Sequence, residues 1–364
     1  MSHPSPLTIP NTTELIGLKF SLQALTSDAL YPQYTIGLHA WFLDQIRQID
    51  PALSTYLHDG ESEKPFTIST LSGQLRAHGQ HLHIQKGTTY DWQITALSQN
   101  VVKGIAVWQK HPPTQLTLKT IPFQIQSITL SPSPTTYRTL WDSARQMRGP
   151  VHLSFTSPTS FRRKGHHFPL PVPNNLFHSY LRRWNDFSGL PFEQDPFLNW
   201  IDETVIIQRL QIETQKVAVG KRGSVTGFVG GLSLNLSSHA DKMPEFRQLF
   251  YALIQLAPYC GTGHKTTFGL GQTQLGWEPN HPQGINQPTD EERLSDRITY
   301  LTHLFLSQRK RTGGDRARQT AETWATILAR REQGDSLLDV AGDLNMPYET
   351  VKTYAKLARR SLRQ

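Results

Sequence analysis

The stretch Gly261-Thr-Gly-His-Lys-Thr-Thr-Phe-Gly-Leu-Gly271 follows a predicted helix that ends near Tyr259 and precedes a predicted strand. Its four glycines allow backbone N–H groups to come close to an anion, because no Cβ blocks the approach. His264 and Lys265 add two basic side chains at the same place. The stretch therefore predicts contact with phosphate, although a tight turn that merely leads into a strand has the same composition.

Two glycine-rich motifs that bind nucleotide cofactors do not fit this stretch. A P-loop has glycine before its lysine and runs from strand to helix, whereas His264 precedes Lys265 and the order here is helix, loop and strand. A dinucleotide fingerprint needs a helix after its glycines, and a strand is predicted there instead. We therefore expect no cofactor at this segment.

The same order of elements is predicted twice along the chain. In the first copy, strands are predicted at 14–25, 65–71, 81–85 and 116–129, and helices at 36–49 and 95–109. In the second copy, strands are predicted at 151–155, 204–214, 226–236 and 270–277, and helices at 174–187 and 245–256. Both copies read β-α-β-β-α-β, which is the ferredoxin-like (RRM-like) arrangement. The sequence thus predicts an α+β chain of two tandem ferredoxin-like domains.

Composition shifts predict the limits of the domains. Two stretches are predicted to be linkers. One is rich in proline and serine and begins at residue 131, and the other, from residue 278, is polar and rich in proline and glycine. The expected division is an N-terminal domain at 1–130, a linker at 131–148, a second domain at 149–277, a linker at 278–295 and a small all-α domain at 296–364.

The C-terminal domain has the pattern of a helix-turn-helix. Val340, Ala341 and Leu344 suit a first helix, Asn345-Met-Pro347 suits the turn, and 350–354 suits the recognition helix. Three uses are open: the domain grips RNA, binds DNA, or docks on the rest of the chain. A plain three-helix packing unit would have the same pattern.

Charge favours a polyanionic partner. The 364 residues carry a formal net charge of +8, and residues 301–364 hold twelve Lys and Arg against seven Asp and Glu. Nucleic acid is the expected partner ahead of a membrane surface. A single cysteine, Cys260, excludes a disulfide framework and makes a cysteine-based metal site unexpected. With no apolar run of about 18 residues and no signal-like start, the expected location is cytoplasmic.

The glycine-rich segment at the end of a second ferredoxin-like domain resembles the signature of the repeat-associated RNA-binding proteins of CRISPR systems. Within them, the chain resembles the endoribonuclease that cuts the precursor transcript inside each repeat to release guide crRNAs. Weaker blocks that also fit are 56–59, 64–66, 154–161 with the basic run after it, 169–173, 181–187 and 227–231. The resemblance covers roughly residues 14–277 and implies CRISPR repeat RNA as partner, with other effector subunits as further candidates.

The resemblance implies cleavage without a metal. A base takes the proton of the 2′-hydroxyl, this oxygen attacks the adjacent phosphorus, and an acid protonates the departing 5′-oxygen. The products are a 2′,3′-cyclic phosphate and a 5′-hydroxyl. Histidine suits both roles, because its pKa lies near the working pH. The residues that match are His39 in the first helix and His58 in the loop after it. Lys64 is a third candidate, as the cation facing the phosphate.

The pattern around these residues also allows ordinary roles. His39 falls within the apolar arc of its helix, which by itself is typical of a core histidine, although its place in the first turn allows contact with water. His58 and Lys64 read as exposed side chains without the resemblance. Tyr34 and Tyr56 are weaker candidates as helpers.

The residues expected to hold the RNA are basic or lie in the glycine-rich segment. They are Arg162, Arg163, Lys164, Gly261, Gly263, His264, Lys265, Gly269 and Gly271. Arg182 and Arg183 sit on a predicted helix, where a solvated face is expected. Two rival functions remain: a non-catalytic crRNA-binding subunit of an effector complex, and a DNA-binding regulator whose N-terminal part binds a ligand.

Overall fold

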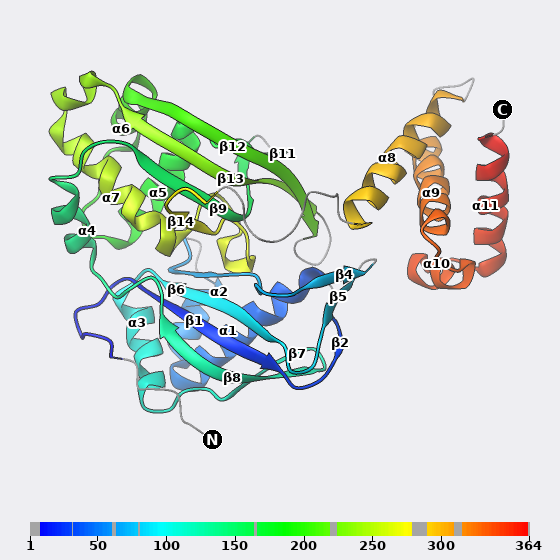
Figure 1. Ribbon diagram of the computed structural model, residues 1–364, viewed down its shortest axis with the longest axis horizontal. Coiled ribbons are helices and arrows are strands. Elements are labelled where there is room, and N and C mark those ends of the chain that lie inside the picture. The colour runs from blue at the N-terminus through cyan, green and yellow to red at the C-terminus, as the bar shows by residue number, and fades with distance from the viewer. Residues whose placement is uncertain are drawn as a thin grey trace. The chain divides into compact units, whose positions relative to one another are not determined.

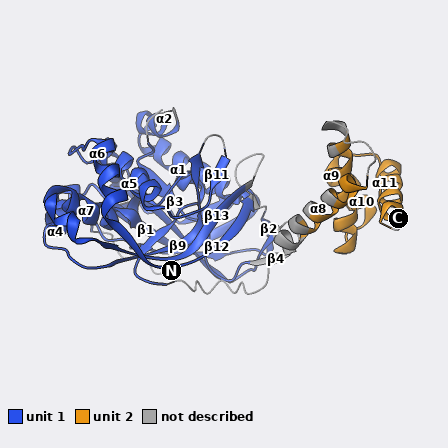
Figure 2. Ribbon diagram, turned by 90° about the horizontal axis from the view of Figure 1, so that it is seen from above, with its two compact units in different colours: residues 1–76, 81–282 blue, residues 77–80, 283–364 orange. Residues whose placement is uncertain are grey.

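The computed structural model describes residues 8–30, 32–59, 63–78, 81–163, 166–218, 224–278, 290–308 and 315–362. The chain divides into two compact units, residues 1–76 with 81–282 and residues 77–80 with 283–364 (Figure 2). The first unit is built on two large antiparallel sheets, of five and four strands, and the second consists mainly of helices. Among the helices that the structure describes, none is both long enough and apolar enough to cross a membrane.

The first sheet has the order β3-β6-β1-β8-β7, and its neighbouring strands pair antiparallel. Its strands are β1 (Ile16–Ala24), β3 (Phe66–Ile68), β6 (Thr89–Ala96), β7 (Gln115–Leu118) and β8 (Ile121–Leu130). The accompanying helices are α1 (Thr35–Ile49), α2 (Pro51–Asp59) and α3 (Gln99–Ala106) (Figure 1). Alternate side chains of β1, among them Phe20 and Leu22, enter the core. Apart from the added β7, this is the ferredoxin-like order.

Three predictions for this domain were wrong in detail. The third strand in chain order is β6 and not 81–85, because Tyr90, Trp92 and Ile94 alternate into the core. The helix predicted to begin at residue 95 therefore begins at Gln99, as α3. Residues 81–84 form β5 (His81–Ile84), which pairs with β2 (Asp28–Leu30) outside this sheet. The single strand predicted at 116–129 is the hairpin β7–β8, which turns at Lys119 with φ 57°.

The second sheet repeats the same topology in the order β12-β13-β9-β14. Its strands are β9 (Val151–Thr159), β12 (Val205–Ala218), β13 (Ser224–Leu236) and β14 (Thr273–Leu275). The helices are α5 (Pro173–Phe187), α6 (Gln194–Thr204) and α7 (Pro244–Cys260), and a hairpin of β10 (Phe161–Arg163) and β11 (His166–Phe168) follows β9 (Figure 1). The predicted α+β class with two tandem ferredoxin-like domains is confirmed.

The stretch 131–148, expected to be a linker, contains helix α4 (Tyr137–Ala144). Thr136 caps it by accepting a hydrogen bond from the backbone N–H of Thr139. Tyr137 and Leu140 are buried in the core of the second domain, so the stretch is part of that domain's packing. The proline-rich start of the stretch concealed this short helix, and α6 was also not predicted.

The second unit contains α8 (Asp290–Ser307), α9 (Asp315–Glu332), α10 (Leu337–Leu344) and α11 (Tyr348–Ser361). Of the predicted linker 278–295, residues 279–289 lie outside the described residues and 290–295 belong to α8. The predicted helix, turn and helix are present as α10, Asn345 in the left-handed conformation, and α11. The remaining short elements are β4 (Arg76–His78), η1 (Pro32–Tyr34), η2 (Val107–Gln109), η3 (Ser238–Lys242) and η4 (Thr266–Phe268).

Candidate active site

The glycine-rich segment forms a loop that only glycine can build at several positions. Gly261, Gly263, Gly269 and Gly271 all have positive φ, between 63° and 85°. A Cβ on Gly263 would lie 2.3 Å from the carbonyl oxygen of Ser160, and one on Gly271 would lie 1.9 Å from that of Thr262. The glycines therefore let the loop pack directly against the backbone at the end of β9.

The expected cradle of glycine N–H groups is wrong for three of the four glycines. The N–H groups of Gly261, Gly263 and Gly271 donate to the carbonyl of Ala257, the hydroxyl of Ser179 and the carbonyl of Pro158. These donors are satisfied within the protein. Contact between this loop and a phosphate therefore falls mainly to side chains.

The loop reaches the first domain through its 3-10 turn, η4. Residues of η4 pack against β3 and α1, and Gly269 sits against Thr70 with 2.8 Å between an added Cβ and Cγ2 of that threonine. Nδ1 of His39 lies 3.0 Å from the carbonyl oxygen of Thr267, 228 residues further along the chain. The His39 ring stacks on Phe268 with centroids 4.5 Å apart and planes 6° from parallel. The predicted histidine and the glycine-rich segment thus meet directly.

This hydrogen bond sets the tautomer of His39. A backbone carbonyl only accepts, so Nδ1 must carry the hydrogen, and the neutral ring keeps its lone pair on Nε2. Burial lowers the pKa of His39 below its usual 6.5, and the nearby positive charges of His58 and Lys64 lower it further against the opposing hydrogen bond to Thr267. His39 is half-buried, so neither the simple core role nor full exposure applies. A neutral ring with a free Nε2 lone pair is suited to act as a base.

His58 lies in the last turn of α2, not in a loop as predicted. Pro51 does end α1, but it also begins α2, because proline suits the first turn of a helix and Asp50 caps that turn through the N–H of Leu53 at 2.9 Å. His58 is exposed, and its carbonyl accepts a hydrogen bond from Nζ of Lys64 at 3.1 Å. Both residues are close enough to His39 to act on its pKa.

A cleft of about 580 Å³ collects much of the predicted site; we call it the basic cleft. Among its lining residues are the predicted Lys64, Arg162, Gly263, His264 and Lys265, together with Glu63, His178, Arg182, Arg183, Thr266 and Thr267. Arg163 instead lies over the ring of Phe168, with 5.2 Å from its guanidinium carbon to the ring centroid. Lys164 lies outside the described residues. The cleft draws lining residues from both ferredoxin-like domains.

His264 is held in place within this cleft. Its Nδ1 lies 2.8 Å from the carbonyl oxygen of Ser160, and its ring stacks on His167 at 5.0 Å between centroids. Burial lowers the pKa of His264, opposed by the hydrogen bond to Ser160 and aided by the positive charges of His167 and Lys265. His264 therefore favours the neutral form, and Lys265 and Arg162 supply positive charge beside it.

Arg183 is a site residue that the sequence analysis missed, and its expected solvated position is wrong. Its side chain is buried, with 5% of the residue exposed, and it donates to the carbonyl oxygens of Ser179 at 3.0 Å and Gly263 at 2.8 Å. It also pairs with Glu63 at 3.4 Å. Arg183 thereby joins α5, the glycine-rich loop and the residue before Lys64. One available signal was its helical spacing, seven residues after Leu176 and three after Tyr180 on the buried side of α5.

The two tyrosines differ in position. Tyr34 is half-buried, and its hydroxyl accepts a hydrogen bond from the backbone N–H of Leu71 at 3.0 Å. Burial raises its pKa to about 12, so this phenol keeps its proton near neutral pH. Tyr56 is exposed on α2. Tyr34 therefore helps to hold the segment that follows β3.

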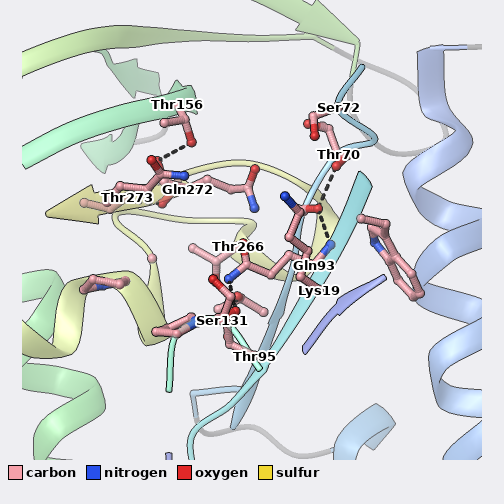
Figure 3. A pocket seen from close by; sticks show the side chains of 18 of the residues that line it. Lys19, Thr70, Ser72, Gln93, Thr95, Ser131, Thr156, Thr266, Gln272 and Thr273 are labelled. Atoms are coloured by element: carbon pink, nitrogen blue, oxygen red, sulfur yellow. Dashed lines mark hydrogen bonds between the residues drawn. The ribbon is translucent and has the colours of Figure 1, made fainter. Parts of the chain in front are cut away.

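A second cleft, also about 580 Å³, lies on the other side of the glycine-rich loop; we call it the polar cleft (Figure 3). Side chains of both domains line it, with Lys19, Thr70, Gln93 and Thr95 from the first and Thr156, Gln272 and Thr273 from the second. Gly261 and Gly271 belong to this cleft, whereas Gly263 belongs to the basic cleft. The loop therefore separates two polar hollows.

Two family models match the chain: the CRISPR Cas6 N-terminal domain over residues 19–145 and the CRISPR-associated endoribonuclease Cas6 over residues 153–273. A solved Cas6 product complex is 24% identical, with TM-score 0.56, covering 72% of this chain and 99% of that one. Thermus thermophilus Cas6 is 21% identical, with TM-score 0.55 and the same coverage. The product of a Cas6-related gene from Pyrococcus furiosus is 15% identical, with TM-score 0.52 and the same coverage. These structures share the fold. A comparison with curated proteins gives no match.

Replacing Gly263 by alanine tests the close packing of the loop. Gly87→Ala is the matched control, because Gly87 has a similar φ of 81° but no atom within 4 Å of an added Cβ. Both changes should cost about 1–2 kcal/mol through backbone strain, and Gly263→Ala should cost a further 1–3 kcal/mol, roughly, from overpacking against Ser160. Urea unfolding measures the difference, and equal losses would contradict the packing role.

Replacing Arg183 by glutamine tests whether it stabilises the site. The change leaves Glu63 half-paired and two carbonyls without their donor, so we expect a loss of about 3–5 kcal/mol in unfolding free energy. Arg182→Gln is the control, because Arg182 contacts the same carboxylate but is largely exposed; its loss should be about 0–1 kcal/mol. Similar effects of the two changes would show that burial of Arg183 contributes little.

Proposed function

The chain belongs to the Cas6 family of CRISPR-associated endoribonucleases that process precursor crRNA, and we propose that it cuts CRISPR repeat RNA at His39 by 2′-hydroxyl attack. The observation that carries this proposal is the environment of His39. Its Nδ1 is engaged by the carbonyl of Thr267, its pKa is lowered, and it adjoins the basic cleft through Thr267. These features favour a neutral imidazole with its reactive nitrogen directed away from the carbonyl.

In the proposed reaction, Nε2 of His39 takes the proton of the 2′-hydroxyl at the cut site. The oxygen attacks the adjacent phosphorus, the P–O5′ bond breaks, and the products carry a 2′,3′-cyclic phosphate and a 5′-hydroxyl. A positioned base of this kind contributes about 10²- to 10⁴-fold to the rate. The reaction requires no metal in this scheme, since side chains supply the base, the acid and the cation.

His58 and Lys64 complete the proposed centre. His58 is exposed at the end of α2, where its imidazolium can protonate the departing 5′-oxygen. Lys64 lines the basic cleft, and its ammonium group would stabilise the additional negative charge of the transition state. Assigning His39 as base and His58 as acid follows from the tautomer and the lowered pKa of His39.

The RNA backbone next to the cut site is proposed to bind in the basic cleft. Arg162, Lys265 and His264 line it, and Arg163 lies on the adjoining hairpin β10–β11. Lys164 is proposed from the sequence as part of the same basic run. Arginine and lysine contacts to phosphates make binding weaken as salt rises. The glycine-rich segment, Gly261 to Gly271, is proposed to shape this surface, with Gly269 fixing its contact to the first domain.

The cleavage assay tests the proposal. Repeat RNA should be cut in the presence of EDTA, and His39→Ala and His58→Ala should each lower the single-turnover rate by about 10²-fold or more. His111→Ala, an exposed histidine elsewhere in the first domain, is the control and should cut at the original rate. A 2′-deoxy nucleotide at the cut site should abolish product.

Four results would contradict this scheme. Cleavage that needs a divalent ion, or product from the 2′-deoxy substrate, would overturn the chemistry. Cleavage that survives both histidine changes would overturn the residue assignment. RNA binding with no cleavage at all would instead identify a non-catalytic crRNA-binding subunit.

The pH dependence gives a separate test of His39. A base acts only when deprotonated, so the rate should fall as pH drops through the pKa of His39, which lies below 6.5. Phe268→Ala removes part of the burial that lowers this pKa, so the acid limb of the pH–rate profile should move up toward 6.5. Phe268→Leu, which keeps more of the burial, should move it less. An acid limb that stays in place in Phe268→Ala would show that the limb belongs to another group.

A further inference from the structure

Helices α8 to α11 of the C-terminal unit lie beyond both family matches, the later of which ends at residue 273, and the proposed cleavage reaction does not use them. We propose that this unit binds duplex DNA by placing the exposed face of α11 in the major groove. The proposal rests on the geometry and charge of α10 and α11 and does not depend on the cleavage mechanism.

Helices α10 and α11 have the arrangement of a helix-turn-helix. α10 lies across the lower ends of α9 and α11 in Figure 1. The turn between them is closed by Asn345 with φ 51° and by the N–H of Met346, which donates to the carbonyl of Ala341 at 3.0 Å. A small core fixes the pair: Val340, Ala341, Val351, Ala355 and Ile327 of α9. The second helix is therefore held rigidly by its inner face.

The outer face of α11 is exposed within its unit and is suited to recognition. Val351, Ala355 and Ala358 are buried, and at 100° per residue Glu349, Thr353, Lys356 and Arg360 fall on the opposite side. These four side chains are exposed, and none of them contributes to either core of the unit. Buried inner positions explain the fold of α11, whereas packing does not explain the basic outer positions.

Charge on the two helices is distributed unequally. α11 carries four cations, Lys352, Lys356, Arg359 and Arg360, against the single acid Glu349. The acids near α10 are engaged internally: Asp335 and Asp343 pair with the largely buried Arg330 at 2.6 and 2.7 Å. Asp339 accepts a hydrogen bond from Ser336 in the N-terminal cap of α10. The surface of α11 is thus complementary to a phosphate backbone.

Groove dimensions favour duplex DNA over duplex RNA. The major groove of B-DNA, about 12 Å wide, admits an α-helix. The major groove of A-form RNA is too narrow and deep for side chains to read. A single helix-turn-helix that contacts phosphates also binds mixed-sequence DNA, with dissociation constants of about 10⁻⁴–10⁻⁶ M. A DNA probe of arbitrary sequence is therefore sufficient to detect the site.

The test measures fluorescence anisotropy of a labelled 30-base-pair DNA duplex with the full chain, from 50 to 200 mM salt. We expect micromolar binding at low salt. The Lys356→Ala/Arg360→Ala double variant should bind about tenfold more weakly and show a salt slope smaller by about two. Arg145→Ala/Lys242→Ala, which removes two exposed cations of the first unit, is the charge-matched control and should bind like the original protein.

Thr353→Glu provides a second variant, because it places a negative charge in the middle of the outer face without touching the core. It should likewise weaken DNA binding about tenfold or more, while unchanged repeat-RNA cleavage would show that the rest of the protein is intact. DNA binding that is absent, that survives both changes in α11, or that is displaced by equimolar repeat RNA would overturn the proposal. An equal loss of binding to duplex RNA and duplex DNA would likewise contradict a major-groove site.

Discussion

The hydrogen bond between Nδ1 of His39 and the carbonyl oxygen of Thr267 is the contact on which the proposed site depends. It joins α1 of the first domain to the glycine-rich loop of the second. The bond determines which ring nitrogen carries the hydrogen, and the neighbouring Phe268 supplies part of the burial that keeps the ring neutral. The second domain thus sets the tautomer and lowers the pKa of His39 in the first domain. This dependence is a physical reason for the two domains to pack together.

The position of Thr267 depends in turn on how the rest of the glycine-rich loop packs against β9 and α5. The left-handed glycines allow the loop to lie against Ser160, and Arg183 holds the carbonyl of Gly263 from the side of α5. The same guanidinium pairs with Glu63, the neighbour of Lys64. One buried cation therefore connects the loop that orients His39 with the segment that presents Lys64, and a change at Arg183 would disturb both sides of the basic cleft.

Local patterns in the sequence predicted much of the fold. Alternating apolar residues located β1 and β13, and helical periodicity located both ends of α1 and the start of α7 to within one residue. The pattern failed at β6, where the strand continues almost directly into α3, and at α4, where a proline-rich stretch suggested a linker. The family resemblance selected His39 and His58 from fifteen histidines, which residue type alone could not do. Their assignment, and the predicted limits of the domains, stay predictions.

What the sequence could not provide are the long-range contacts. The partners of His39 lie 228 residues away, and Arg183 looked like one of two equivalent arginines on a helix. In the fold, Arg183 faces the loop and is buried, whereas Arg182 is largely exposed. The chemistry explains why such contacts matter: full exposure would leave the pKa of His39, the proposed base, near its usual value, and full burial would make Nε2 inaccessible to RNA. The half-buried position of His39 between the two domains meets both requirements, and neither domain could create it alone.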